Sequence, residues 1–329
     1  MTAHSEPLLA LDGVSRDFAS GIGLTARFLN LFGANYQSPI VRAVDTVSLN
    51  LAKGEIVGLV GESGCGKSTA GRMAAGLLEP SSGTVRIKGR AITAGRQPLA
   101  VQMIFQDPFS SLNPRKRVAA LVGEAVKVHH IVPPAGIDDY ADSLLARCGI
   151  DPSFKRRYPH QFSGGQRQRI CIARALAVKP EALICDEAVS ALDVSIQAQI
   201  LNLFLDLRDE LGLAYLFISH DLGVIEHVSD RVLVMYLGRI VESAPAAGLF
   251  RQANHPYTRA LLAEAPRLSR RAQAYSGVQG ELPSPLNPPS GCHFHPRCPA
   301  AMPLCREERP ALREISPGHF SACHLNSQL

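Results

Sequence analysis

Short apolar runs alternate with helical amphipathic segments along most of the chain. Runs with strand-type patterns occupy residues 8–18, 43–51, 56–60, 84–88, 101–105, 182–185, 214–219 and 231–236. Amphipathic helical segments separate the later runs, and a segment over 118–149 has helical periodicity interrupted by two prolines. Strands that alternate with helices predict a parallel sheet with crossover helices, so the pattern indicates an α/β fold.

The pattern changes near Arg267. From there proline is frequent, regular periodicity is lost, and four cysteines occur close to the C-terminus. We therefore expect a domain boundary between about Glu242 and Arg270. It separates a main domain over residues 1–255, with a helical lobe inserted at about 108–178, from a small irregular extension over 256–329.

The composition is that of an ordinary globular protein, with 46% hydrophobic and 19% charged residues. The longest apolar stretches, such as Leu213 to Ile218, are far shorter than the roughly 18 residues that a membrane-spanning helix needs. The N-terminal residues have no basic segment followed by an apolar one, so we expect a cytoplasmic location. A net charge of +5 without a run of basic residues identifies no partner by itself.

A phosphate-binding motif follows the strand predicted over 56–60. Residues 61–68, GESGCGKS, match the pattern G-x-x-x-x-G-K-[ST] and precede a predicted helix. Glycines allow main-chain N–H groups to face phosphate oxygens, and the helix N-terminus adds a positive dipole end. We expect Lys67 to reach the β and γ phosphates, Ser68 to hold Mg²⁺, and Thr69 to add a phosphate contact. Cys65 lies within the loop without being required for this chemistry.

Two adjacent carboxylates end the apolar strand over 182–185. Asp186 is the candidate Mg²⁺ ligand, and Glu187 is the candidate general base that orients and deprotonates the attacking water. His220 and Gln106 also follow strands. His220 is a candidate sensor of the γ-phosphate, and Gln106 is a candidate contact to Mg²⁺ and to the water. Taken alone, either side chain is equally compatible with an ordinary surface residue.

Further motifs resemble those of ABC ATPases. Residues 162–169, FSGGQRQR, resemble the signature sequence of that family, and they precede the carboxylate strand as the family order requires. Gln106, His220 and the segment 190–193, SALD, match the Q-loop, the switch histidine and the D-loop. The resemblance covers roughly residues 8–265, and five motifs in order make it very specific.

The resemblance implies a P-loop NTPase (RecA-like) core with an antiparallel β subdomain and an inserted helical lobe. It also implies a head-to-tail dimer in which each ATP lies between the phosphate loop of one subunit and the signature loop of the other. The expected ATP contacts are Gly61, Ser63, Gly64, Cys65, Gly66, Lys67, Ser68, Thr69, Ser163, Gly164, Gly165, Gln166 and Asp193. Phe18 is the candidate aromatic that stacks on adenine, with Phe28 and Tyr36 as alternatives.

The C-terminal residues narrow the resemblance. Segments 254–262, NHPYTRALL, and 291–299, GCHFHPRCP, resemble the extension of dipeptide and oligopeptide importer ATPases. That subfamily implies two transmembrane permeases, a second ATPase that is commonly a paralogue, and an extracytoplasmic solute-binding protein. It places the chain peripherally on the cytoplasmic face of the inner membrane. Related importers carry nickel, glutathione or other small solutes, so the cargo stays open.

The four late cysteines are a candidate metal site. Cys292, Cys298, Cys305 and Cys323 are separated by five, six and seventeen residues, a wider spacing than that of zinc ribbons. Some members of the subfamily hold an iron–sulfur cluster with such cysteines, and four thiolates suit a [4Fe–4S] cluster. The alternatives are Zn²⁺, with help from His293, His295, His319 or His324, and no metal at all.

A different class of proteins contains the same kind of ATPase domain. ATPases of DNA repair or chromosome handling split these motifs with a long coiled coil or a zinc module, whereas about fifty-six residues separate Gln106 from Ser163 here. Translation factors of the superfamily carry two such ATPase domains in one chain, and this chain has one set of the motifs. We therefore expect no nucleic-acid partner. We expect the part of the helical lobe near residues 107–116 to dock onto the membrane permeases.

Overall fold

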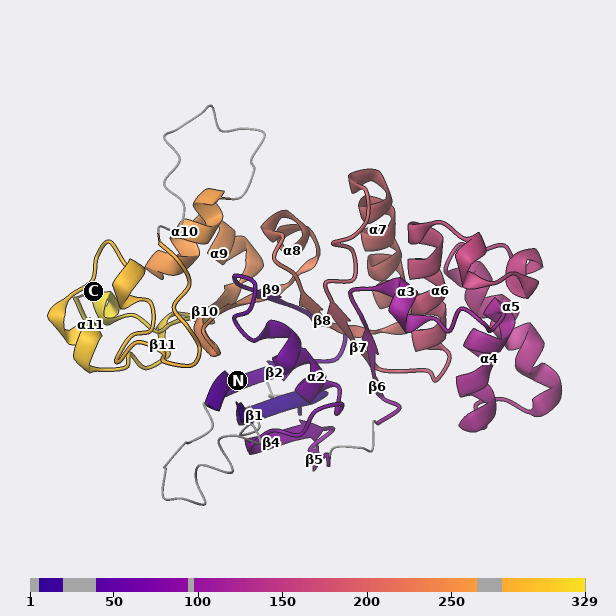
Figure 1. The fold of residues 1–329 in the computed structure, drawn as a ribbon, viewed down its shortest axis with the longest axis horizontal. Coiled ribbons are helices and arrows are strands. Elements are labelled where there is room, and N and C mark those ends of the chain that lie inside the picture. The colour runs from indigo at the N-terminus through magenta and orange to yellow at the C-terminus, as the bar shows by residue number, and fades with distance from the viewer. Residues whose placement is uncertain (1–5, 20–39, 94–97, 265–279, 329) are drawn as a thin grey trace, which may run out of the picture.

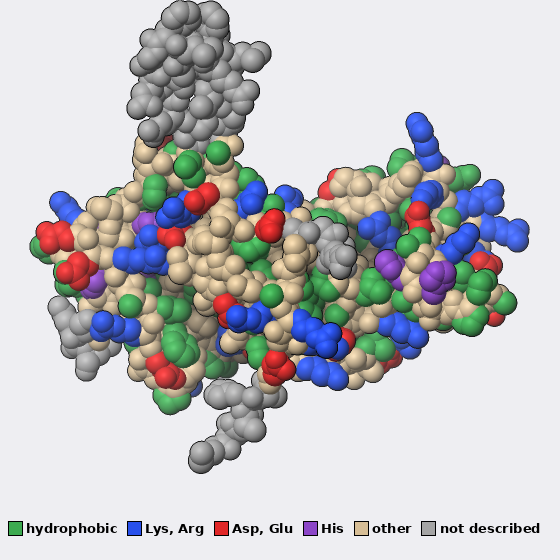
Figure 2. Space-filling model, turned by 90° about the horizontal axis from the view of Figure 1, so that it is seen from below, with side chains coloured by type: hydrophobic (Ala, Val, Ile, Leu, Met, Phe, Trp, Pro, Cys, Tyr) green, Lys and Arg blue, Asp and Glu red, His purple; other side chains and the backbone are tan. Residues whose placement is uncertain are grey.

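The computed structural model describes residues 6–19, 40–93, 98–264 and 280–328. Figure 1 shows an elongated molecule with the C-terminal segment at one end of the long axis and the helical lobe at the other. The two β-sheets lie between these ends. The face drawn in Figure 2 carries both acidic and basic side chains.

The main sheet has eight strands in the order β11-β12-β10-β9-β3-β8-β7-β6. Its parallel part is β6, β7, β8, β3 and β9, which confirms the predicted parallel α/β core. The other three strands pair antiparallel. The bounds are β3 (Ile56–Val60), β6 (Val101–Ile104), β7 (Ala182–Asp186), β8 (Ala214–Ile218), β9 (Arg231–Tyr236), β10 (Arg239–Pro245), β11 (Arg313–Ser316) and β12 (His319–Ser321).

A second sheet is antiparallel, with the order β2-β1-β4-β5. It consists of β1 (Leu9–Ala19), β2 (Ile40–Leu51), β4 (Ser82–Ile87) and β5 (Arg90–Ala91). Figure 1 shows it beside α2 (Lys67–Ala74), on one side of the main sheet. This is the antiparallel subdomain that the family resemblance implied.

Helices cover the main sheet and form the lobe. The lobe contains α3 (Pro108–Ser111), α4 (Val118–Val128) and α5 (Ile137–Arg147), which pack on α6 (Gly164–Leu176). The remaining helices are α7 (Val194–Leu211), α8 (Leu222–Val228), α9 (Ala246–Arg251), α10 (Pro256–Glu264) and α11 (Pro303–Glu307). Across the described ranges, no helix combines the length and the apolar character that crossing a membrane requires.

The parallel strands bury both of their faces, which is why their sequences are continuously apolar. In β8, Tyr215 and Phe217 belong to a core shared with α6, α7 and the lobe. Leu216 and Ile218, which point the other way, belong to a second core shared with α2 and the antiparallel sheet. The helix that follows the phosphate loop and the helix that follows the signature sequence therefore pack on opposite faces of one sheet.

The C-terminal extension is less irregular than its sequence suggested. Its strands β11 and β12 extend the main sheet, because β12 pairs with β10 at Glu242 and Ser243. Both strands are short and mostly polar, and β12 pairs with β10, which lies far away in the sequence, so no local pattern marks their place in the sheet. The extension thus shares a sheet with the main domain.

A buried carboxylate fastens this extension. Glu242 on β10 is 0% exposed, and it accepts hydrogen bonds from the main-chain N–H groups of Asn254 and His255, at 2.7 and 3.0 Å. Its Oε1 also lies 2.7 Å from Nε2 of His319 on β12. A buried carboxylate is tolerated only with such partners.

Replacing that carboxylate should loosen the extension. Glu242→Ala leaves two main-chain donors and one imidazole without a partner in the interior, so we expect the free energy of unfolding to fall by about 3–5 kcal/mol. Urea unfolding, with limited proteolysis to locate early cleavage, measures this change. Glu307→Ala, an exposed site on α11, is the matched control. Equal stability of the two variants would contradict the fastening role.

Candidate nucleotide-binding site

The phosphate loop connects the buried strand β3 to α2. Gly66 is the residue before the helix, with φ 107°, a left-handed conformation that favours glycine. A Cβ atom there would lie 2.1 Å from the Ala43 carbonyl oxygen on β2. The loop therefore passes so close to the antiparallel sheet that only glycine fits at this position.

Lys67 is almost fully buried within the loop. Its Nζ donates hydrogen bonds to the carbonyl oxygens of Gly61, at 2.8 Å, and Glu62, at 2.9 Å. Three donors on one ammonium allow it to hold the loop and to bind an anion. Burial raises the pKa of the Cys65 thiol despite the nearby ammonium, which leaves this cysteine a protonated packing residue.

Ser68 and Asp186 meet at the end of the parallel strands. The Ser68 hydroxyl donates to Oδ1 of Asp186 at 2.8 Å. Burial raises the pKa of Asp186, and the neighbouring Glu187 adds to this, while the Ser68 hydrogen bond opposes it. A buried carboxylate with a hydroxyl beside it is an oxygen donor set that a divalent cation would stabilise.

Glu187 lies at the centre of the second group of predicted residues. Its Oε2 accepts a hydrogen bond from Nε2 of Gln106 at 2.8 Å, and its Oε1 lies 3.2 Å from Nδ1 of His220. Its φ is 49°, a strained conformation for a residue with a side chain. The structure thus brings together the three side chains that the sequence marked as catalytic candidates, each from the end of a different strand.

The signature residues form a separate group at the start of α6. Ser163 caps this helix, since its Oγ accepts from the Gln166 N–H at 3.3 Å and its own N–H donates to Gln166 Oε1 at 3.0 Å. A Cβ at Gly165 would lie 2.4 Å from a methyl group of Ile196, so α6 and α7 approach closely here. The cap presents partly exposed N–H groups that suit an anion.

Other predicted contacts lie at the edges of these groups. Asp193 is exposed at the start of α7, and Thr69 is partly buried on α2. Phe18 is exposed near the end of β1, with the Arg16 guanidinium 4.9 Å from its ring centroid. The alternatives Phe28 and Tyr36 lie outside the described residues.

Two C-terminal residues contact the phosphate loop, and the sequence did not predict this. The Glu62 N–H donates to the Tyr257 hydroxyl at 2.9 Å, and Arg297 Nη1 lies 3.0 and 3.1 Å from the two carboxylate oxygens of Glu62. Tyr257 also packs on Tyr236 and Phe294. Both residues fall within the segments that resemble importer ATPases, which was the only available signal.

The four late cysteines gather in the extension. The Cys292 N–H donates to the Cys305 carbonyl at 2.9 Å. Burial raises the pKa of Cys292 to about 11, and the nearby thiols of Cys305, Cys323 and Cys298 raise it further. Within the ranges that the structure describes, no three His, Cys, Asp or Glu side chains are placed to hold a metal ion.

Two family models match the chain. The model described as "ABC transporter" matches residues 44–190, which include the phosphate loop, the signature and the carboxylate pair. The model described as "Oligopeptide/dipeptide transporter, C-terminal region" matches residues 241–305. Residues 191–240, which include His220 and most of the segment 190–193, lie between the two matched ranges.

Similar proteins extend the match to the whole chain. The oligopeptide transport ATP-binding protein AppF of Bacillus subtilis is 48% identical, and the match covers 99% of both chains. A putative peptide import ATP-binding protein of Brucella abortus is 53% identical over 87% of both chains. A putative oligopeptide transport ATP-binding protein of Bacillus subtilis, YkfD, is 49% identical over 87% of this chain and 90% of its own length.

Solved structures agree on the fold. The structure of cbiO1 from Clostridium perfringens, part of an ABC transporter complex, has a TM-score of 0.62 and 26% identity, covering 75% of this chain and 92% of its own. The cassette MJ0796 has a TM-score of 0.61 at 24% identity, covering 72% and 98%. The family follows from the sequence identity of about one half with AppF over nearly the full chain and from the arrangement of the motifs. The chain belongs to the family of ABC transporter ATP-binding proteins, in the group that carries the oligopeptide/dipeptide transporter C-terminal region.

Proposed function

We propose that this chain hydrolyses ATP to drive an importer of oligopeptides, dipeptides or a related small solute. The observation that carries the mechanism is the placement of Glu187 between Gln106 and His220. The names of the relatives, oligopeptide transport and peptide import ATP-binding proteins, support the class of cargo. They give no support to an ATPase of DNA repair or chromosome handling.

Hydrolysis requires a water oxygen to attack the γ-phosphorus as the bond to the β–γ bridging oxygen breaks, which yields ADP and phosphate. Glu187 is suited to orient this water and accept its proton. Gln106 and His220 each contact one carboxylate oxygen of Glu187 and so fix the orientation of this carboxylate. Lys67 and the loop N–H groups bind the β and γ phosphates, and His220 supplies a further donor toward the γ-phosphate.

Mg²⁺ fits the donor set at the strand ends. Ser68 and Asp186 are the residues that would hold it, with Gln106 as the additional oxygen ligand. Mg²⁺ supplies positive charge to the β and γ phosphate oxygens. The buried Asp186 carboxylate, which its surroundings disfavour as an anion, supports this assignment.

A head-to-tail dimer completes the site. The phosphate loop leads into α2 on one face of the main sheet, whereas the signature loop leads into α6 on the other. This separation supports a composite site in which each ATP lies between one subunit's phosphate loop and its partner's Ser163, Gly164 and Gly165. ATP then joins two such subunits, and hydrolysis lets them separate. Whether the second ATPase is identical or a paralogue is left open.

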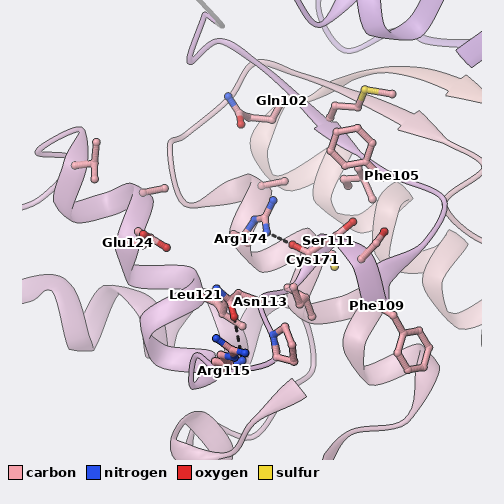
Figure 3. Close-up of a pocket in the computed structure, with 18 of the residues that line it drawn as sticks. Gln102, Phe105, Phe109, Ser111, Asn113, Arg115, Leu121, Glu124, Cys171 and Arg174 are labelled. Atoms are coloured by element: carbon pink, nitrogen blue, oxygen red, sulfur yellow. Dashed lines mark hydrogen bonds between the residues drawn. The ribbon is translucent and has the colours of Figure 1, made fainter. Parts of the chain in front are cut away.

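A cleft in the helical lobe is the proposed permease contact. It has a volume of about 830 Å³ and lies between β6 and helices α3, α4 and α6 (Figure 3). Phe109 and Val128 at its margin are 64% and 63% exposed, so they offer apolar surface to a partner. Residues 102–105 line the cleft, so a permease segment seated there would contact β6 and the residue that precedes Gln106. Such docking places the chain peripherally on the cytoplasmic face of the membrane, with a solute-binding protein on the far side.

The four late cysteines are proposed to hold a [4Fe–4S] cluster. Mutually close, half-buried thiols suit a group that takes four thiolates. A cluster spreads its ligands over four irons, whereas Zn²⁺ requires them to converge on one ion. The number of thiols in one segment, and not a preformed ion site among the described residues, is what supports the cluster. Its role would be structural.

The role of Glu187 as general base can be tested by substitution. Glu187→Gln should bind MgATP with unchanged affinity and lower the turnover rate by about 10²- to 10⁴-fold, because an amide cannot accept the water proton. Nucleotide binding and phosphate release are measured on the same preparation. Glu226→Gln, an exposed site on α8, is the control. Wild-type turnover by Glu187→Gln would exclude the proposed role.

The permease contact at the cleft of the helical lobe can be tested by co-purification. The tagged chain, recovered from membranes, should bring with it two permeases and a second ATPase. Phe109→Asp should weaken that association by about 2 kcal/mol or more, because it places a charge in an apolar contact. Leu211→Asp, at an apolar site 41% exposed at the end of α7, should not. Recovery of DNA or ribosomes alone would favour the other class of function.

The cluster proposed for the four late cysteines can be tested by elemental analysis. Anaerobically purified protein should contain iron and sulfide, roughly four of each per chain. Cys298→Ser should lose both, and Cys171→Ser, which changes a cysteine on α6, should retain them. Elemental analysis and visible absorption measure the outcome. Zinc in place of iron, or metal-free protein of normal stability, would reject the cluster.

A further inference from the structure

The phosphate loop contains a carboxylate of its own. Glu62 is the second residue of the segment 61–68, and its side chain is 23% exposed. Its main-chain carbonyl accepts a hydrogen bond from the Lys67 ammonium at 2.9 Å, so one hydrogen bond joins this residue to the group assigned to the β and γ phosphates. Like charges repel strongly at short range in a partly desolvated site. The loop therefore carries a charge that opposes the binding of its own anionic ligand.

The charge of Glu62 acts on the interior of the loop. Burial raises the pKa of the Cys65 thiol, the Lys67 ammonium lowers it, and the Glu62 carboxylate raises it. The sulfur of Cys65 lies 3.9 Å from Lys67 Nζ. The carboxylate and the ammonium thus act on the same small volume, with opposite signs.

Arg297 supplies a compensating charge from the C-terminal extension. Its Nη1 lies 3.0 and 3.1 Å from the two carboxylate oxygens of Glu62, and its side chain is only 6% exposed. The same nitrogen donates to the Tyr236 hydroxyl at 3.4 Å. The Arg297 N–H donates to the Phe294 carbonyl at 3.0 Å, and the rings of Phe294 and Tyr236 pack at 5.3 Å. Buried groups therefore hold the guanidinium against Glu62.

Attachment of the extension does not require this ion pair. A neutral hydrogen bond joins the same two parts, because the Glu62 N–H donates to the Tyr257 hydroxyl at 2.9 Å. The Tyr257 ring is fully buried and packs on Tyr236 at 4.6 Å and on Phe294 at 5.4 Å. The pairing of β12 with β10 attaches the extension a second time. A largely desolvated ion pair adds little to such attachment, since the cost of desolvation offsets the attraction.

We propose that Arg297 is a positioning residue of the nucleotide site and acts through Glu62. It cancels the charge of this carboxylate, fixes its orientation, and so allows the phosphates of ATP to bind beside it. This inference rests on the binding of ATP by the loop, and it adds that part of the affinity for ATP comes from the C-terminal extension. Without Arg297, the Glu62 carboxylate is left uncompensated near the β and γ phosphates.

Calorimetric titration of the full chain with Mg²⁺ and AMPPNP, a non-hydrolysable ATP analogue, separates charge cancellation from attachment. Arg297→Gln should raise the Kd at least about tenfold. The double variant with Glu62→Gln loses the same ion pair but leaves no charge in the loop, so its Kd should return to within about threefold of wild type. A defect in the extension itself would persist in the double variant. Arg306→Gln, at an exposed arginine on α11, is the control and should leave the Kd unchanged.

Two single variants test the charge without removing the guanidinium's place. Arg297→Lys should keep the Kd within about threefold of wild type, because one nitrogen contacts both oxygens and an ammonium can replace it. Glu62→Gln alone removes the repulsive charge while Arg297 stays, so it should bind the analogue more tightly than wild type. Circular dichroism checks that each variant is folded.

The outcomes distinguish this inference from the proposed function. A double variant as weak as Arg297→Gln would show that the pair serves attachment alone and would overturn the inference. Unchanged binding by Arg297→Gln, or weaker binding by Glu62→Gln, would overturn it as well. If the wild-type chain failed to bind the analogue, the proposed ATPase function would fail, and this inference with it.

Discussion

The parallel pairing of β8 with both β3 and β7 is the constraint on which the nucleotide site depends. This register places Asp186 opposite Ile218, and main-chain hydrogen bonds join Glu187 to Ile218 and Ser219 to Leu59. The phosphate loop, the carboxylate pair and His220 therefore emerge at one edge of the sheet. A shift by one residue would turn every side chain of the strand to the opposite face. The two apolar cores, which interleave along each of these strands, prevent such a shift.

Much of this site could be predicted from sequence because its parts are local. The loop over 61–68 and the pair at 186–187 each combine a strand end with the side chains that it positions, so spacing alone indicates the chemistry. The contacts of Tyr257 and Arg297 with Glu62 could not be predicted in that way. They join residues 195 and 235 positions apart, and the segments that carry Tyr257 and Arg297 indicate the subfamily without indicating this contact. The same holds for β12, which has only three residues.

Buried charge marks the places where the structure is most constrained. Lys67, Asp186 and Glu242 are all nearly or fully buried, and each is tolerated through specific partners. Glu242 serves the fold alone, since its partners belong to main-chain segments and to β12. Lys67 and Asp186 lie where phosphate and Mg²⁺ would bind, so their burial prepares a site. Glu187, with its strained φ, resembles Lys67 and Asp186 in this respect, because strain of this kind is retained where the position of a side chain matters more than stability.

The contact of Arg297 and Tyr257 with Glu62 has a consequence for how such proteins can be recombined. The extension follows the cassette in sequence, yet it supplies part of the support of the phosphate loop. Swapping extensions between paralogues would therefore also change the environment of Glu62 in the phosphate loop. A chimera should keep Glu62, Tyr257 and Arg297 from the same parent. In this sense the phosphate loop and the C-terminal extension form one structural unit.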